Sequence, residues 1–240
     1  MKSDDASCAV PCPLCLQRGT TAPFASDAAR EYWICSQCDL VFVPPHFHPA
    51  ADAEKKRYDT HQNDPADPGY RRFLSKLAAP LKARLPARAE GLDFGCGPTS
   101  ALALLLEEAG FRMYRYDPFY APDRTALEQA YDFIACSEAA EHFFQPAREW
   151  ELLLRLVKPG GWLGIMTLLR EKDVDFSRWW YRNDFTHVVF YSRRTFEWLA
   201  RRDGLAVEFE GPSVVLLRKP PFSRPDGESG AGFRTSPGSV

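Results

Sequence analysis

The chain of 240 residues is long enough for one domain of ordinary size and a small additional module. Its 45% hydrophobic and 26% charged residues are typical of a globular protein, and no apolar run approaches the roughly 18 residues of a membrane span. The formal net charge of -2 argues against a large nucleic-acid-binding surface. Because the acidic N-terminus has no apolar signal sequence, we expect a cytoplasmic protein without membrane contact.

Seven cysteines in a cytoplasmic chain indicate bound metal or free thiols rather than disulfide bonds. Two Cys-x-x-Cys pairs, Cys12 with Cys15 and Cys35 with Cys38, have the separation that is typical of a four-cysteine zinc site. One tight turn brings both sulfurs of a pair onto one ion. Two pairs complete a closed tetrahedral shell, which is structural rather than catalytic. The spacing of Cys8 makes it a poor substitute ligand.

Apolar residues surround the second cysteine pair, at positions 32–34 and 40–43. They predict a small β-ribbon that is too small to fold without its metal. We therefore expect a zinc-ribbon module over residues 1–49, with a core separate from that of the rest of the chain.

Residues 50–90 are predicted to form a helical connector. A short helix is expected over residues 50–58, and apolar residues recur at helical spacing over residues 70–85, where Pro80 predicts a kink. The polar stretch between these helices, residues 58–64, is a candidate for the lining of a cofactor or acceptor pocket. A solvated turn would account for its composition equally well.

A glycine turn follows the connector. Residues 92–94 predict the end of a buried strand, and Gly95 and Gly97 allow a backbone path that a Cβ atom would forbid. Thr99 and Ser100 are suitable N-cap residues for a helix that runs to about residue 109. The helix start would direct unpaired N–H groups into the turn, which predicts a nucleotide-type site at the carboxyl edge of a parallel sheet.

Two acidic residues narrow the cofactor class. Asp93 lies two positions before the first glycine, and the third glycine of a dinucleotide G-x-G-x-x-G turn is absent because position 100 is serine. Asp117 follows a predicted strand over residues 111–116, roughly 20 residues beyond the glycines, where a carboxylate accepts both ribose hydroxyls. Asp117 alone suits NAD and S-adenosylmethionine (SAM) equally.

The remaining chain predicts further strands and helices. Strands are expected over residues 131–137, 162–168, 205–210 and 214–218, helices over residues 148–157 and 195–202, and a turn at residues 158–161. In order along the chain, D-F-G-C-G, then D-F-I followed by E-H, then K-P-G-G-W-L resemble the class I SAM-dependent methyltransferase family over residues 91–219. The resemblance implies an α/β fold, with a Rossmann-like, mostly parallel sheet flanked by helices and a final antiparallel hairpin.

The chain departs from the family between Asp117 and Tyr131, where there is little room for the usual third strand and its helix. In the family, an acidic residue after that third strand often recognises adenine, and this chain has no obvious counterpart to it. Phe119 or Tyr120 could stack on the adenine ring instead.

The resemblance also implies a set of cofactor-binding residues: Asp93, Phe94, Gly95, Gly97, Asp117, Pro118, Cys136, Ser137 and Glu138. Cys136 to Glu138 would lie beside the methionine part of SAM. The catalytic candidates are His142, one helical turn beyond Glu138, and His187, in the segment that commonly approaches the acceptor. Either has a pKa suited to a base near neutral pH, although capping or packing would explain each histidine as well. An aromatic wall is expected from Trp179, Trp180, Tyr181 and Phe185, although simple packing would explain these residues equally well.

The expected function is methyl transfer from SAM to a small-molecule acceptor. A four-cysteine ribbon before this domain resembles both sugar C-methyltransferases and ribosomal-RNA guanine methyltransferases, so a ribosomal- or transfer-RNA base methyltransferase that docks RNA through the ribbon is the alternative. Residues 55–57 form the only basic cluster, which weighs against RNA. A non-catalytic SAM-binding protein is a third hypothesis. Residues 220–240, rich in Pro, Gly and Ser, predict a disordered tail.

Overall fold

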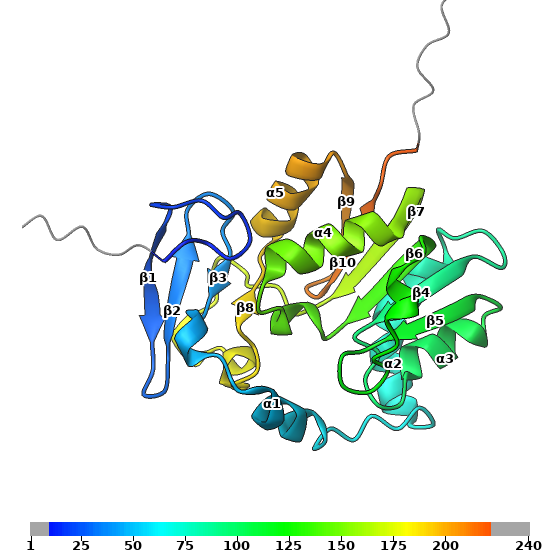
Figure 1. Cartoon of the computed structure of the whole chain (residues 1–240), viewed down its shortest axis with the longest axis horizontal. Coiled ribbons are helices and arrows are strands. Elements are labelled where there is room, and N and C mark those ends of the chain that lie inside the picture. The colour runs from blue at the N-terminus through cyan, green and yellow to red at the C-terminus, as the bar shows by residue number, and fades with distance from the viewer. Residues whose placement is uncertain (1–9, 222–240) are drawn as a thin grey trace, which may run out of the picture.

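The computed structural model describes residues 10–221, which form two β-sheets and the helices that cover them (Figure 1). Cys8 and all but the first two residues of the predicted tail lie outside the described residues. Over the part of the chain that the structure describes, no helix is both long enough and apolar enough to cross a membrane.

The larger sheet has six strands in the order β5-β4-β6-β7-β10-β9. Its strands are β4 (Glu90–Phe94), β5 (Arg112–Tyr116), β6 (Tyr131–Ser137), β7 (Val157–Met166), β9 (Ala206–Glu210) and β10 (Val214–Arg218). The first four strands in the spatial order are parallel, and β10 runs antiparallel to both of its neighbours. The predicted α/β fold and its final hairpin are therefore confirmed. Within residues 10–221, no strand lies between β5 and β6, as the short segment after Asp117 predicts.

Helices cover both faces of this sheet. They are α2 (Pro68–Lys82), α3 (Ala101–Glu107), α4 (Pro146–Leu156) and α5 (Arg193–Asp203). Helix α1 (Ala51–Tyr58) stands away from both faces (Figure 1). Because side chains alternate along a strand, Phe133 and Ala135 of β6 pack with α2 and α3, whereas Ile134 and Cys136 pack with α4 and α5. The predicted kink residue, Pro80, lies inside α2.

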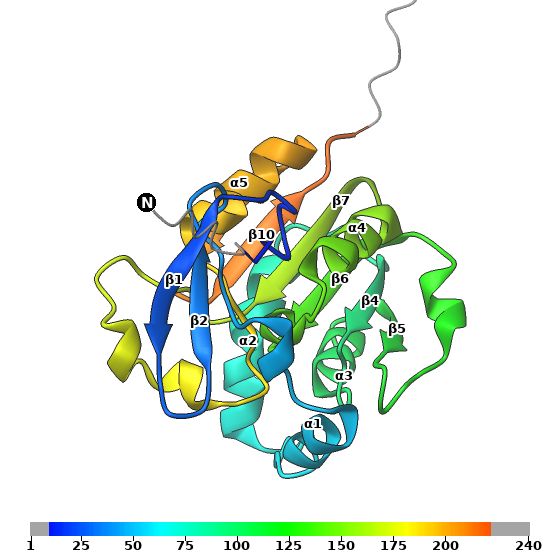
Figure 2. The same ribbon diagram turned by 60° about the vertical axis from the view of Figure 1, so that its left-hand side comes forward.

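The smaller sheet combines the N-terminal ribbon with a strand from the other end of the chain, in the order β1-β2-β3-β8. Its strands are β1 (Thr21–Ser26), β2 (Glu31–Cys35), β3 (Val41–Phe42) and β8 (Val189–Phe190). Val41 pairs with Phe190 and Phe42 with Val189. Figure 2 shows the hairpin of β1 and β2 standing beside the larger sheet.

The expectation of a separate ribbon core is wrong. Leu14 and Leu40 of the ribbon belong to one buried cluster with residues of the larger domain. These are Trp150 of α4, Phe196 of α5 and Tyr191, which lies between β8 and α5. The physical reason is that the ribbon alone would leave one edge of β3 and its apolar face uncovered. Strand β8 pairs with that edge, and α4 and α5 pack on that face. The ribbon and the SAM-type domain therefore share one core.

The predicted turn at residues 158–161 also needs correction. Strand β7 begins at Val157, directly after α4, and contains these four residues. They form an irregularity within the strand, because the register with β6 shifts there and Gly160 has a φ of +80°. The glycines thus allow the strand to bulge rather than end.

Candidate functional site

A cavity of about 810 Å³ opens at the carboxyl ends of β4, β5 and β6. Ligands bind at this edge of parallel α/β sheets, because the loops that follow the strands converge there. Helix α1 and the segment of residues 180–187 contribute the opposite wall. The polar stretch at residues 58–64 lines the cavity through Tyr58, His61 and Asn63, while residues 59–62 and 64 are exposed to solvent.

The two glycines of the turn after β4 do different things. Gly95 has a φ of +76°, and a Cβ atom added there would lie 2.5 Å from the Cβ of Ala139. Gly97 has a φ of +64°, lines the cavity, and has no heavy atom within 4 Å of an added Cβ. Gly95 is therefore required by packing, whereas the open space beside Gly97 is available to a ligand.

The start of α3 differs from the prediction. Ser100 has a φ of +47° and makes no side-chain capping bond, since a left-handed residue does not direct its hydroxyl toward the following N–H groups. Thr99 instead donates its hydroxyl to the main-chain carbonyl of Asn63 at 2.8 Å. That bond joins the glycine turn to the polar stretch on the other side of the cavity.

Asp117 is buried where β5 ends, and three main-chain N–H groups hold its carboxylate. Oδ2 accepts from the N–H of Gly97 at 3.0 Å, and Oδ1 accepts from those of Phe119 at 2.8 Å and Tyr120 at 3.1 Å. These bonds fix the carboxylate at the cavity and leave it further lone pairs for hydroxyl donors. Phe119 and Tyr120 also line the cavity.

Two more carboxyl groups lie in the same part of the cavity. Burial raises the pKa of Asp93 to about 7, although its Oδ2 accepts from the N–H of Ala103 at 3.2 Å. Burial, reinforced by the nearby Glu141, raises the pKa of Glu138 to about 9. A cation near these groups would favour their ionised forms, so this wall suits a ligand with an ammonium group.

Of the other expected cofactor residues, some line the cavity and one lies in the core. Phe94, Pro118 and Ser137 line the cavity. Cys136 is fully buried and packs among the residues beneath α4 and α5, away from the lining. Its place in β6 explains this, because the side chain before Ser137 points to the opposite face of the strand.

His142 and His187 meet on the far side of the cavity, with ring centroids 4.8 Å apart. His142 Nδ1 donates to the carbonyl of Thr186 at 2.9 Å, and His187 Nδ1 donates to that of Tyr181 at 2.7 Å. Because a carbonyl only accepts, each Nδ1 carries the hydrogen and each Nε2 of the neutral rings has a free lone pair. Burial lowers the pKa of His187 to about 4, so this ring is neutral at pH 7 and the expected pKa near neutrality is wrong for His187.

Glu141 lies beside the two histidines, and their proton-accepting or ligating atoms all lie within 4.8 Å of one another. Its Oε1 accepts the hydroxyl hydrogen of Tyr181 at 2.5 Å, while Oε2 is buried without a hydrogen-bond partner among the described residues. This oxygen therefore has an acceptor site that no group of the described chain uses. The sequence placed Tyr181 only in an aromatic wall, since nothing local identifies Glu141 as its partner.

The aromatic wall itself is partly as expected. Trp180 and Tyr181 line the cavity, whereas Trp179 packs in the core of the smaller sheet and Phe185 is 44% exposed outside the lining.

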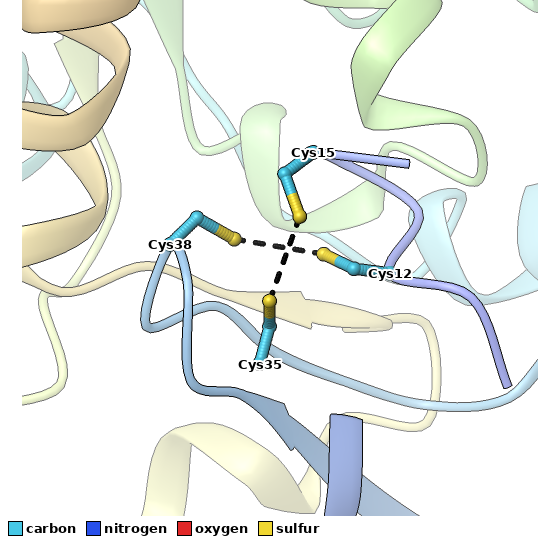
Figure 3. Close-up of side chains that lie close together, drawn as sticks. All are labelled: Cys12, Cys15, Cys35 and Cys38. Carbon is cyan, nitrogen blue, oxygen red and sulfur yellow. Dashed lines mark hydrogen bonds between the residues drawn. The ribbon is translucent and has the colours of Figure 1, made fainter. Parts of the chain in front are cut away.

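The four cysteines of the two Cys-x-x-Cys pairs point toward one centre (Figure 3). The Sγ atoms of Cys12 and Cys38 are 3.5 Å apart, as are those of Cys15 and Cys35, and all four lie within 4.8 Å of one another. A tetrahedral ion with metal–sulfur bonds of about 2.3 Å needs sulfurs about 3.8 Å apart, so this donor set fits such an ion.

Comparison with known proteins places this fold and cavity in a family. Residues 64–209, more than half of the chain, match the family described as "Methyltransferase domain". The chain belongs to this family.

The methyltransferase domain is similar to two curated relatives, both named ubiquinone biosynthesis O-methyltransferase. That of Sodalis glossinidius (strain morsitans) is 34% identical over 94 residues, which make up 39% of this chain and 38% of the relative. That of Paraburkholderia phytofirmans is 37% identical over 89 residues, which make up 37% of this chain and 38% of the relative. The chain thus spans about two fifths of the length of the curated relatives it matches.

Among solved structures, the methyltransferase domain is similar to a chain of the complex formed by the Haloferax volcanii Trm112 methyltransferase activator. The TM-score is 0.50 and the identity 18%, and the match covers 71% of this chain and 96% of that chain. This likeness concerns the fold alone.

Proposed function

We propose that the protein transfers a methyl group from SAM to a small, hydroxyl-bearing acceptor. The observation that carries the proposal is that one cavity contains the Asp117 carboxylate and glycine turn at one side and the His142–His187 pair at the other. The names of the two curated O-methyltransferase relatives favour a hydroxyl acceptor. Bound SAM would supply an electrophilic methyl group for an in-line displacement, which depends chiefly on alignment.

The residues of the turn fit SAM better than NAD. Asp117 would accept the ribose hydroxyls, and Gly97 leaves room for the ligand against the main chain. Asp93 and Glu138 would accept hydrogen bonds from the ammonium group of SAM, a donor that NAD lacks because the charged nitrogen of its nicotinamide ring carries no hydrogen. Phe119 or Tyr120 would stack on adenine. The described chain has no strand between β5 and β6 that could place an acidic residue to hydrogen-bond the adenine ring.

On the acceptor side, His187 or His142 would take the hydroxyl proton at Nε2. In each ring, Nδ1 donates to a main-chain carbonyl, which fixes the orientation of the ring. The unpartnered Oε2 of Glu141 could accept a second hydrogen from the acceptor or stabilise the imidazolium that forms. General-base action of this kind usually contributes about 10²–10⁴-fold to the rate.

The charge of the cavity favours a neutral acceptor over RNA. The lining contains seven carboxyl side chains but a single cationic side chain, Arg124. A phosphate-bearing polymer gains affinity by pairing its phosphates with Lys and Arg, which this lining does not offer.

We also propose that the four-cysteine cluster holds one structural zinc ion. The donor set is four sulfurs without room for a water ligand, which suits a closed site. We further propose that the predicted zinc ribbon, over its described residues 10–49, and the methyltransferase domain of residues 91–219 act as one folded unit, joined by residues 50–90.

Calorimetry with SAM, S-adenosylhomocysteine and NAD tests the function. SAM and its product should bind, and Asp117→Ala should weaken binding by about 1–3 kcal/mol, the cost of losing charge-assisted hydrogen bonds. Asp175→Ala is a matched control, since the exposed Asp175 caps a turn whose residues, Phe176–Arg178, lie outside the lining. Tight NAD binding without SAM binding would exclude the proposal.

A further inference from the structure

Arg30 is a buried arginine of the ribbon that contacts the acceptor side of the cavity. It lies in the turn between β1 and β2 and is only 7% exposed. All five N–H donors of its guanidinium have acceptors: Nε donates to the Tyr32 hydroxyl at 2.9 Å, Nη1 to the carbonyls of Phe185 at 3.0 Å and His187 at 2.9 Å, and Nη2 to the carbonyls of Asp184 at 2.8 Å and Arg182.

These partners are unusual for a buried charge. Among residues 10–221, Arg30 forms no ion pair. The carboxylate of Asp27, in the same turn, instead accepts from Tyr32 at 2.8 Å and pairs with Arg182 at 2.6 Å. Four main-chain carbonyls within six residues, 182–187, therefore balance most of the charge. Their oxygens can converge on one planar guanidinium only if this segment curves around it.

The same segment fixes the orientation of the His187 ring. His187 Nδ1 donates to the carbonyl of Tyr181, at the start of the curve, and Asp184 pairs with Arg57 of α1 at 2.7 Å. If the curve opens, the Tyr181 carbonyl moves away from His187 Nδ1. The ring then loses the bond that fixes its orientation in the wall of the cavity.

We propose that Arg30 is a positioning residue for the acceptor site: it holds residues 182–187 in the curve that orients His187. The catalytic meaning of this orientation rests on the proposed function, whereas the orientation itself does not. The ribbon is thereby a part of the acceptor site, because a residue between its two long strands shapes the wall opposite the cofactor side.

The imidazole nitrogen signals of His187 provide the test. In protein labelled with nitrogen-15 at its five histidines, these signals distinguish an Nδ1–H ring from an Nε2–H ring, and His187→Gln assigns them. The variants are Arg30→Met, which removes the charge and all donors, and Arg30→Lys, which keeps the charge but not the planar fork. Arg170→Met is the matched control, because Arg170 is also largely buried, with 10% of its side chain exposed. It pairs with Asp39 of the ribbon at 2.6 Å and has no hydrogen bond or ion pair with residues 180–187 of the described chain.

We expect His187 of the wild type to show the Nδ1–H form, and both Arg30 variants to show a mixture of the two ring forms, as free histidine does. Arg170→Met should lower the melting temperature but keep the wild-type signal. Binding of S-adenosylhomocysteine should be unchanged in all three, and turnover of the Arg30 variants should fall about 10²-fold with unchanged KM for SAM.

An unchanged His187 signal in Arg30→Met, or an equal change in Arg170→Met, would overturn the proposal. If Arg30→Met does not fold, Arg30→Lys decides by the same signal. Because the measurement needs no methyl acceptor, a failure of the proposed function would show as absent cofactor binding with the His187 result intact.

Discussion

Replacing each glycine of the turn by alanine should separate packing from ligand binding. At Gly95, a Cβ atom meets the Cβ of Ala139 at 2.5 Å, and the φ of +76° is unfavourable for alanine. The left-handed backbone costs about 1–2 kcal/mol, and the overpacking about 1–3 kcal/mol. Gly95→Ala should therefore lower the free energy of unfolding by about 2–5 kcal/mol.

Gly97→Ala should behave differently, because its Cβ meets nothing within 4 Å although its φ is +64°. We expect a loss of about 1–2 kcal/mol from the backbone alone. The new methyl group would occupy the open cavity beside the main chain, so affinity for S-adenosylhomocysteine should fall in this variant. At Gly95, by contrast, the nearest atom to an added Cβ belongs to Ala139, so that substitution should act mainly through packing.

Urea unfolding and calorimetry on four chains measure both effects: the wild type, each single variant, and Gly95→Ala combined with Ala139→Gly. The double variant removes the clash but not the strained φ, so it should recover the overpacking part of the stability loss. If Ala139→Gly recovers nothing, the contact is not the cause. If Gly97→Ala binds S-adenosylhomocysteine as the wild type does, the ligand does not approach this side of the turn.

Three further outcomes are expected. The double variant Cys35→Ser/Cys38→Ser should have a zinc content near zero in elemental analysis. Because the core is shared, the whole chain should unfold in one transition at a lower melting temperature. A second transition at the wild-type temperature would contradict this. The Asp93 carboxyl keeps its proton to about pH 7 in the folded state but only to about pH 4 when unfolded, so the free energy of unfolding should fall as pH rises through this window. Asp93→Asn should lack up to about 4 kcal/mol of that fall in urea titrations at pH 4 to 8, and an identical slope would refute the assignment. His187→Gln should retain S-adenosylhomocysteine binding and lose about 10²–10⁴-fold in turnover, whereas exposed His46→Gln should lose nothing; equal rates in both would remove His187 from the mechanism.

The sequence predicted the elements that local patterns specify. Strand β6 has its predicted bounds, Tyr131–Ser137, because a run of alternating and β-branched or aromatic residues ends at turn-forming neighbours. Asp117 lies at the cavity because the strand before it and the glycine turn share one edge of the sheet. These placements follow from parallel topology, which the motif order already implied.

Long-range partners could not be predicted in the same way. The carbonyls that Arg30 binds lie more than 150 residues away, and no periodicity records which backbone oxygens an arginine will meet. Strands β3 and β8 contain two residues each, which is too short for a recognisable pattern of alternating apolar residues in the sequence. The ribbon therefore appeared to be independent when only its cysteine spacing was considered.

The joining of β3 to β8 has a consequence for the order in which the protein folds during synthesis. All four cysteines of the cluster leave the ribosome within the first 38 residues, whereas the strand that completes their sheet ends at Phe190. The thiols are thus available to metal long before β8 can cover the edge of β3. A ribbon that binds metal early would hold the edge of β3 in place until β8 has been synthesised. The acceptor wall could take its final shape only after residue 190 had left the ribosome.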